Sequence, residues 1–347
     1  RRAPECHRGY PRLSTLPPTS PMLLAPALLE IQGPVRVRLD RVPEEMWRIV
    51  RADAPIVESV NAHLTHMKGK MFRPTVLLLA SSLEEAPQER AVTMGAIAEL
   101  IHLASVVHDD SVDHSPLRRG MPTINALFSH QVAVIAGDYL YSRALAELVT
   151  QGDLEPLRVF TGASNAMTLG ELRQLASYDA LEFTEADYWL LVQAKTASLI
   201  SASCEVGALC GAPRFRKEMA RFGTLLGMSF QVADDLLDYT ETESVTGKPS
   251  GNDLKEHKVT LPLIASMQQM SRAQRARVET LFAAPQPSDA EIADVVAIVH
   301  ECGGIDFARR KGEEFAGEAD AVLDSLPASD ARHALSETLG YVMDRRS

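Results

Sequence analysis

Residues 94–113, which read MGAIAELIHLASVVHDDSVD, contain the most informative pattern in the chain. Apolar side chains recur at spacings of three and four over 94–107, and this period predicts a helix. The helix runs into the acidic sequence HDDSVD at 108–113, in which Asp109 and Asp113 lie about one helical turn apart. Like charges at this spacing repel, so they weaken a plain surface helix unless a cation binds there. Oxygen ligands on adjacent turns suit Mg²⁺.

A second acidic sequence, DDLLD at 234–238, follows the first after 234 − 109 = 125 residues. It also ends an apolar stretch, over 222–232. One such cluster alone would equally fit a solvated acidic helix end. Two clusters that each end an apolar helix favour facing walls of one cavity, with metal ions between them. The candidate metal ligands are Asp109, Asp110, Asp113, Asp234, Asp235 and Asp238.

Most of the chain carries the same helical signal. Aromatic residues make up only 5% of the sequence, and alternation typical of strands is scarce. Apolar residues recur with helical spacing at 132–149, 188–209, 218–239 and 261–270. These segments are apolar on more than one face, which is typical of helices buried in a large bundle. We therefore predict an all-α fold, a single-domain helical bundle around a central apolar cavity, over residues 35–347.

Residues 1–34 are expected to be a poorly ordered leader. The first 21 residues contain several arginines and prolines and no periodic apolar pattern. They lack the apolar core of a secretory signal. Two origins fit this segment: sequence upstream of a natural start at Met22, or a short targeting peptide.

Composition narrows the range of partners and the compartment. The formal net charge of −11 argues against nucleic acid as a partner, because a phosphate backbone attracts basic surfaces. The sequence contains no run of about 18 uncharged apolar residues, so no transmembrane segment is expected. The four cysteines form no C-x-x-C pair and fit a reducing cytoplasm. We therefore predict a cytoplasmic protein.

Basic residues near the acidic clusters and at helix ends point to a phosphate-bearing ligand. Arginine binds phosphate oxygens through two parallel hydrogen bonds, and lysine acts as a compact charge. Each of these residues alone would also fit a solvated surface charge, so the prediction rests on the set. The candidates are Lys70, Arg73, Arg118, Arg119, Lys195, Lys248 and Lys258.

Ten short segments, taken in chain order, resemble the trans-polyprenyl diphosphate synthases, the helical isoprenyl diphosphate synthases. The resemblance extends over residues 45–345. The segments are GK…RP at 69–74, ELIH at 99–102, DDSVD at 109–113, RRGMPT at 118–123, GD at 137–138, GELRQ at 170–174, KTA at 195–197, FQVADDLLD at 230–238, GK at 247–248 and DLKEHKVTLP at 253–262.

The resemblance implies an isoprenoid synthase fold, a homodimer and an Mg²⁺-dependent transferase. Such an enzyme condenses isopentenyl diphosphate with an allylic diphosphate, head to tail, to give an all-trans polyprenyl diphosphate. About three Mg²⁺ ions per active site would then bridge the allylic diphosphate to Asp109, Asp113 and Asp234. Asp110, Asp235 and Asp238 would support these ions directly or through water.

The resemblance also implies roles for the remaining candidates. Arg118, Lys195 and Lys258, joined by Lys248, would hold the allylic diphosphate. Lys70, Arg73, His102 and Arg119 would hold isopentenyl diphosphate. Thr196 and Gln231 would face the reacting carbons. Arg345 and Arg346 are further candidates, because members of the family often end in basic residues. His257 departs from the family pattern, which often has glycine before this lysine.

Two small residues bear on product length. Ser105 and Ala104 lie four and five positions before Asp109, about 6–7.5 Å along the helix. Small side chains there leave a product channel open, although they would also suit close helix packing. The spacing inside DDSVD has two residues and lacks the longer insert of short-chain bacterial relatives. By analogy with the family that the chain resembles, both features imply a medium or long product, roughly C30 to C50.

Three alternatives compete with this interpretation. A shorter-chain farnesyl or geranylgeranyl diphosphate synthase would give a C15 to C20 product. A class I terpene cyclase would share the bundle and one aspartate motif, but it lacks the second intact DDxxD and the ligands for isopentenyl diphosphate. A regulatory subunit of a heteromeric prenyltransferase would have lost ligands that are present in this sequence.

Overall fold

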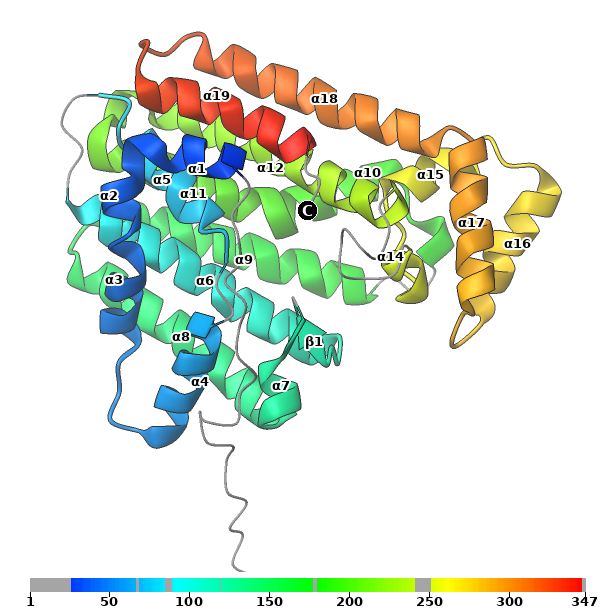
Figure 1. Cartoon of the computed structure of the whole chain (residues 1–347), viewed down its shortest axis with the longest axis horizontal. Coiled ribbons are helices and arrows are strands. Elements are labelled where there is room, and N and C mark those ends of the chain that lie inside the picture. The colour runs from blue at the N-terminus through cyan, green and yellow to red at the C-terminus, as the bar shows by residue number, and fades with distance from the viewer. Residues whose placement is uncertain are drawn as a thin grey trace, which may run out of the picture.

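The structure is a computed structural model that describes residues 26–66, 69–84, 89–118, 120–176, 180–240 and 251–344. These residues form helix after helix (Figure 1), which confirms the predicted all-α class. The described strands are β1 (Leu117–Arg118) and β2 (Met121–Pro122), which pair antiparallel in a short hairpin.

The helices that the structure describes follow one another along the chain. They are α1 (Pro26–Gln32), η2 (Gly33–Val35), α2 (Arg36–Leu39), α3 (Val42–Val50), α4 (Pro55–His66), α5 (Phe72–Ala80), α6 (Arg90–Val112), α7 (Ile124–Leu127), α8 (His130–Thr150), α9 (Leu154–Ala176), η3 (Ala180–Glu182), α10 (Glu185–Val192), η4 (Gln193–Ala197), α11 (Ser198–Gly211), η5 (Pro213–Phe215), α12 (Arg216–Thr240), α14 (Asn252–Lys255), α15 (Leu261–Met267), α16 (Arg272–Ala283), α17 (Asp289–Glu301), α18 (Gly304–Leu323) and α19 (Asp330–Met343).

Helix α6, which contains the predicted segment 94–107, lies inside the bundle and packs against α3, α5, α8 and α11. Among the helices that the structure describes, it alone is long and apolar enough to cross a membrane. However, 67% of its apolar window is buried inside the protein, as in the core helix of a bundle. Its acidic end is therefore attached to a rigid central element.

Helix α12 joins the two hydrophobic clusters of the fold. Its first half contributes Phe222 and Leu226 to the larger cluster, which also contains residues of α5, α6 and α11. Its second half contributes Val232 and Leu236 to the smaller cluster, beside α15, α17 and α18. The second acidic cluster thus lies on a helix that is packed along its whole length.

The described helices begin before the predicted boundary at residue 34. Residues 26–32 form α1, whose Leu28 and Ile31 are fully buried and which packs against α19. These apolar residues are three apart, so they share one face of the helix. Gln32 also donates hydrogen bonds to the carbonyl oxygen of Lys70 and to Thr75 Oγ1, both at 3.2 Å. The predicted leader is therefore wrong for residues 26–34, while residues 1–25 lie outside the described part.

Candidate active site

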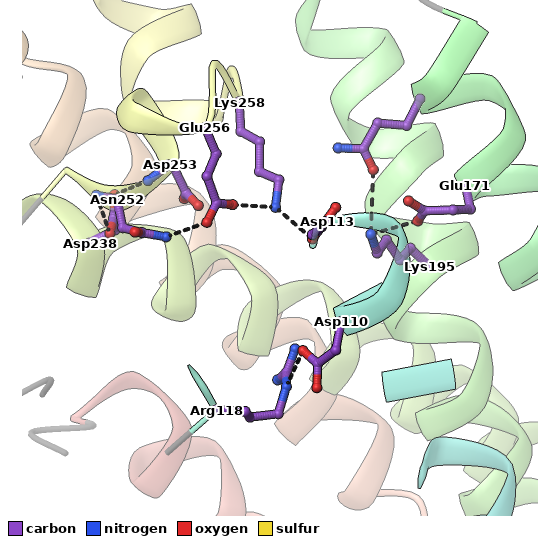
Figure 2. A network of polar contacts seen from close by, with 11 residues as sticks. Asp110, Asp113, Arg118, Glu171, Lys195, Asp238, Asn252, Asp253, Glu256 and Lys258 are labelled. Carbon is purple, nitrogen blue, oxygen red and sulfur yellow. Dashed lines mark hydrogen bonds and ion pairs between the residues drawn. The ribbon is translucent and has the colours of Figure 1, made fainter. Parts of the chain in front are cut away.

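The first acidic cluster closes the C-terminal end of α6. Asp113 is the helix C-cap, and its backbone N–H donates to the carbonyl oxygen of Asp109 at 2.8 Å. The β1–β2 hairpin folds back so that Arg118 Nε donates to Asp110 Oδ1 at 2.7 Å (Figure 2). Asp110 is buried, with 4% of its surface exposed, so its charge requires such a partner. Arg118, a predicted phosphate-binding residue, therefore lies directly against the aspartates that are predicted to bind metal.

Lys258 links this cluster to the segment that follows the second one. Its Nζ donates to Asp113 Oδ2 at 3.3 Å and to Glu256 Oε2 at 2.7 Å (Figure 2). Burial lowers the pKa of Lys258, but Glu256 and Asp113 outweigh burial and raise it above its usual value. The ammonium therefore remains charged. This contact joins residues 145 positions apart and brings both acidic regions to one site.

The second acidic cluster holds the short helix α14 in place. Asp238 Oδ1 accepts the backbone N–H of Asn252, and its Oδ2 accepts that of Asp253, both at 3.0 Å (Figure 2). The backbone N–H of Gly251 also donates to the Asp238 carbonyl oxygen at 2.8 Å. A carboxylate is favourable at this position, because it accepts N–H groups that have no partner at a helix start. Asp238 thereby positions the segment that ends in Lys258.

The π-helical turn η4 presents Lys195 and Thr196. Lys195 Nζ lies 2.6 Å from Glu171 Oε2 on α9 (Figure 2). It also lies 3.4 Å from Gln174 Oε1 on the same helix. Thr196 Oγ1 donates to Gln231 Oε1 on α12 at 2.6 Å. Single π-helical turns inside α-helices often occur at functional sites. This turn places the two predicted side chains between α9 and α12.

Close helix packing allows the contact between Thr196 and Gln231. A Cβ on Gly227, one turn before Gln231, would lie 2.5 Å from the Cα of Ala197. A Cβ on Gly223, another turn earlier, would lie 2.7 Å from the Cα of Ser201. Only glycine permits the backbones to approach this closely. Two glycines four residues apart therefore set the distance between α12 and the η4–α11 segment.

Positive backbone φ angles occur beside three of the predicted ligands. In the described part of the chain, the non-glycine residues with positive φ are Met71, His114 and His257. They adjoin Lys70, Asp113 and Lys258, respectively. Such conformations are unfavourable for L-residues and tend to cluster at functional sites.

His257 has φ of 54°, which explains why glycine is common at this position in the family that the sequence resembles. Two contacts hold the histidine there. Its Nε2 lies 2.9 Å from the carbonyl oxygen of Ala284, and its ring meets that of Phe282 edge-on at 5.7 Å. The loop that carries Lys258 is thus attached to the end of α16.

The predicted ligands of isopentenyl diphosphate lie on α6 and around the start of α5. Lys70 precedes α5, and its Nζ lies 5.8 Å from the centre of the Tyr341 ring on α19. Arg73 lies in the first turn of α5, which packs directly against α6. His102 lies on α6, seven residues before Asp109 and therefore about two turns along the same face. Arg119, Lys248, Arg345 and Arg346 lie outside the described residues.

Residues 54–299 match the sequence profile of the polyprenyl synthetase family, which is more than half of the chain. The chain belongs to the polyprenyl synthetase family. It is 37% identical over 298 residues to the all-trans-nonaprenyl-diphosphate synthase (geranyl-diphosphate specific) of Rhodobacter capsulatus, an alignment that covers 85% of this chain and 91% of the relative. It is 34% identical over 309 residues to heptaprenyl diphosphate synthase component 2 of Geobacillus stearothermophilus, covering 88% and 95%.

Solved structures give the same result. A polyprenyl synthase from Caulobacter crescentus CB15, complexed with calcium and isoprenyl diphosphate, superposes with a TM-score of 0.87 at 28% identity. The superposition covers 92% of this chain and 98% of that structure. This confirms the predicted isoprenoid synthase fold. The chain is a trans-prenyltransferase of the medium- or long-chain type, as the sequence predicts.

The donor atoms of this polyprenyl synthetase fit a hard divalent cation such as Mg²⁺. Both acidic clusters offer carboxylate oxygens, which Mg²⁺ prefers. Burial, with Glu171 and Asp113 nearby, raises the pKa of Asp109 against the opposing effect of Lys195, so a further positive charge would be favourable there. Within the described part of the chain, no three His, Cys, Asp or Glu side chains lie close enough to enclose an ion. Mg²⁺ commonly takes one or two carboxylates and completes its shell with water and phosphate oxygens.

Several side chains in the site of this polyprenyl synthetase were not assigned a role from the sequence. Glu171 and Gln174 pair with Lys195, and both lie in the segment GELRQ that carries part of the resemblance. Burial and the nearby Asp238 raise the pKa of Asp253 to about 7. The position of Asp253 in DLKEHK, a segment of the family resemblance, could have marked it as a site residue. Tyr188 bonds to Asp235 at 2.6 Å, and no local pattern marks it.

Replacing Gly227 with Ala is expected to reduce both stability and activity. The added methyl would force α12 away from Ala197, which costs roughly 1–3 kcal/mol of unfolding free energy. The same shift would lengthen the bond between Thr196 and Gln231. Thermal unfolding and steady-state assays would measure the two effects. The matched control is Gly317→Ala on α18, whose Cβ would meet nothing within 4 Å; wild-type behaviour in both variants would contradict the packing argument.

Proposed function

We propose that this polyprenyl synthetase uses Mg²⁺ to condense isopentenyl diphosphate with an allylic diphosphate, giving a product of roughly C35 to C50 at a site between α6 and α12. The contact of Lys258 with Asp113 carries this proposal. It supports one shared site because it connects the acidic end of α6 with the segment that Asp238 holds. Arg118 and Lys195 lie against the same carboxylate-rich region.

Three positively charged side chains are proposed to hold the allylic diphosphate. Arg118, Lys195 and Lys258 each pair with a carboxylate in the structure: Asp110, Glu171 and Asp113. The pairs with Asp110 and Asp113 hold Arg118 and Lys258 against the first acidic cluster, and the charge of Lys195 acts on Asp109. A diphosphate would then add strong oxygen acceptors beside groups that are already positioned, which lowers the entropy cost of binding.

Metal ions at Asp109, Asp113 and Asp234 would neutralise charge that develops on the departing diphosphate. Asp234 is exposed and Asp109 is half-buried, so these groups can be reached from solvent. Asp110, Asp235 and Asp238 form hydrogen bonds or ion pairs within the protein, which supports an indirect role for them.

The chain also offers groups for the carbon chemistry. The oxygens of Thr196 and Gln231 would stabilise positive charge on the allylic carbon without forming a covalent bond to it. Lys70, Arg73 and His102, with Arg119, would orient isopentenyl diphosphate so that its double bond attacks this carbon. The proton lost afterwards would pass to the released diphosphate. An apolar channel behind the metal-binding aspartates would exclude water, which would quench the carbocation.

We also propose that this enzyme is a cytoplasmic homodimer. Leu169, Leu172 and Leu175 form an exposed apolar stripe along α9, at 45%, 57% and 61% exposure. Ile135 on the neighbouring α8 is 65% exposed. An apolar stripe of this kind supports burial against a second subunit. One relative is named component 2 of heptaprenyl diphosphate synthase, so pairing with a different chain is the competing arrangement.

The test is incubation of the purified chain with labelled isopentenyl diphosphate, farnesyl diphosphate and Mg²⁺. We expect elongated polyprenyl diphosphates, identified by chromatography after dephosphorylation. A chelator should abolish product formation, and added Mg²⁺ should restore it. Equal activity after metal removal would contradict the metal-dependent mechanism. A folded chain that forms no product alone would support a heteromeric component instead.

A further inference from the structure

Four side chains form a continuous hydrogen-bonded chain behind the proposed reaction centre. Tyr188 Oη donates to Asp235 Oδ2 at 2.6 Å, and Gln231 Nε2 donates to Asp235 Oδ1 at 2.8 Å. Thr196 Oγ1 then donates to Gln231 Oε1 at 2.6 Å. Tyr188 and Asp235 are buried, with 3% and 4% of their surfaces exposed, whereas Gln231 and Thr196 are half-buried. The chain therefore runs from the core toward the reaction centre.

Asp235 is the acceptor at the buried end of this chain, so it sets the direction of the bonds that follow. Gln231 turns its NH₂ group toward Asp235 Oδ1. The amide oxygen of Gln231 is then directed to Thr196, and the Thr196 hydroxyl donates its proton in a hydrogen bond to that oxygen. Lone pairs of Thr196 and Gln231 are consequently left for other contacts. A flipped Gln231 would instead present N–H groups, which repel positive charge.

Tyr188 supplies the other hydrogen bond to the buried carboxyl group of Asp235. A phenol hydroxyl has one proton, and this proton is donated to Asp235 Oδ2. Without this donor, one buried carboxylate oxygen would lose its partner, which is costly.

Local structure holds the Tyr188 ring in place. Helix α10 begins with a capping box in which Thr184 and Asp187 bond reciprocally. The Tyr188 ring meets the Trp189 ring edge-on at 4.8 Å, and Trp189 Nε1 donates to Glu185 at 3.0 Å. The phenol is thus fixed by its own helix and does not depend on Asp235 for its position.

We propose that Tyr188 is a positioning residue that acts through Asp235 to keep the oxygen atoms of Gln231 and Thr196 directed at the allylic carbon. This inference rests on the proposed function. It assigns Asp235 to the orientation of Gln231 and not to metal binding. Tyr188 itself is not expected to touch either substrate.

The test is Tyr188→Phe, which removes the hydroxyl and keeps the ring. We expect kcat to fall about tenfold or more, because a buried oxygen of Asp235 loses its hydrogen-bond donor. The KM values for both substrates and the Mg²⁺ concentration for half-maximal rate should change by less than about twofold, since no ligand contact is removed. The matched control is Tyr239→Phe, which removes another buried tyrosine hydroxyl on α12, one whose contact is Thr260. Its kcat should stay within about twofold of wild type.

A double-mutant cycle tests the route of the effect. Thr196→Val should lower kcat, and adding Tyr188→Phe should lower it little further, because both act through one chain. Fully additive losses would overturn the inference. So would unchanged kcat in Tyr188→Phe, or an equal loss in Tyr239→Phe.

A second variant keeps the inference testable if Tyr188→Phe does not fold. In Asp235→Asn, the amide oxygen can still accept the hydrogen bond from Tyr188, but the amide NH₂ group then faces the NH₂ group of Gln231. Gln231 should lose its orientation, so kcat should fall at any Mg²⁺ concentration. Rescue by excess Mg²⁺ would place Asp235 at the metal and overturn the inference. An inactive wild-type chain would contradict the proposed function, whereas an active wild type with an unaffected Tyr188→Phe variant would contradict this inference alone.

Discussion

Replacing Asp109 with Asn is expected to lower kcat by about 10²–10³-fold, which is typical for loss of one group that stabilises developing charge. The amide cannot supply the negative charge that a metal ion beside Lys195 and Asp113 requires. Asp109 is half-buried, and the charges of Lys195, Glu171 and Asp113 act on it, so the substitution changes a site that is already strongly charged. Asp234→Asn, on the opposite wall, should show a loss of similar size.

Steady-state rates over a range of Mg²⁺ concentrations measure this effect. The Mg²⁺ dependence of each variant should move to higher concentration, while the unfolding temperature stays close to that of wild type. Asp306→Asn is the matched control, because Asp306 is exposed in the first turn of α18. Near-wild-type activity of Asp109→Asn and Asp234→Asn would remove both aspartates from the metal site.

Ser105→Phe is expected to shorten the product by one or more isoprene units. Ser105 lies four residues before Asp109 on α6, so it shares a face with Asp109 about 6 Å further along the helix. The residue is half-buried, and its hydroxyl bonds to the carbonyl oxygen of His102 at 2.8 Å. A phenyl ring at this level would fill the channel that the growing chain is proposed to enter.

Ala104→Phe should also shorten the product, but it should lower the stability of the protein at the same time. Ala104 is only 3% exposed and belongs to the large hydrophobic cluster, so a larger side chain also strains the core by roughly 1–3 kcal/mol. Chromatography of dephosphorylated products, together with thermal unfolding, separates the two effects. Ser105→Ala is the control and should leave product length unchanged. Unchanged length in both phenylalanine variants would refute the channel argument.

Much of the helical architecture was predictable from local pattern. The apolar spacing over 94–107 predicts a helix that ends at the acidic cluster, and α6 does end at Val112. The predicted segments 132–149 and 218–239 lie within α8 and α12. Such predictions succeed because a helix that buries more than one face must repeat apolar residues every three to four positions.

Two parts of the fold were not predictable in this way. Helix α1 is short, and Pro34 lies close behind it, so its two buried apolar residues give little periodic signal. The interruption of the predicted helix 188–209 by the π-helical turn η4 depends on packing against α9 and α12. Neither feature follows from intrinsic helix propensity.

The sequence by itself determined the helical class, the two acidic clusters and the family resemblance, because periodicity and motif spacing are properties of short stretches. The assignment of the site residues to individual roles remains a prediction. Only the tertiary structure decided that Lys258 reaches Asp113, that Lys195 lies against Glu171, and that Tyr188 bonds to Asp235. These contacts join residues far apart in the chain, as does the bond between Thr196 and Gln231, whose geometry depends on how closely α12 approaches η4. The absence of a side chain at Gly227 lets α12 pack directly against the backbone of Ala197. No local sequence pattern reveals that these two residues meet.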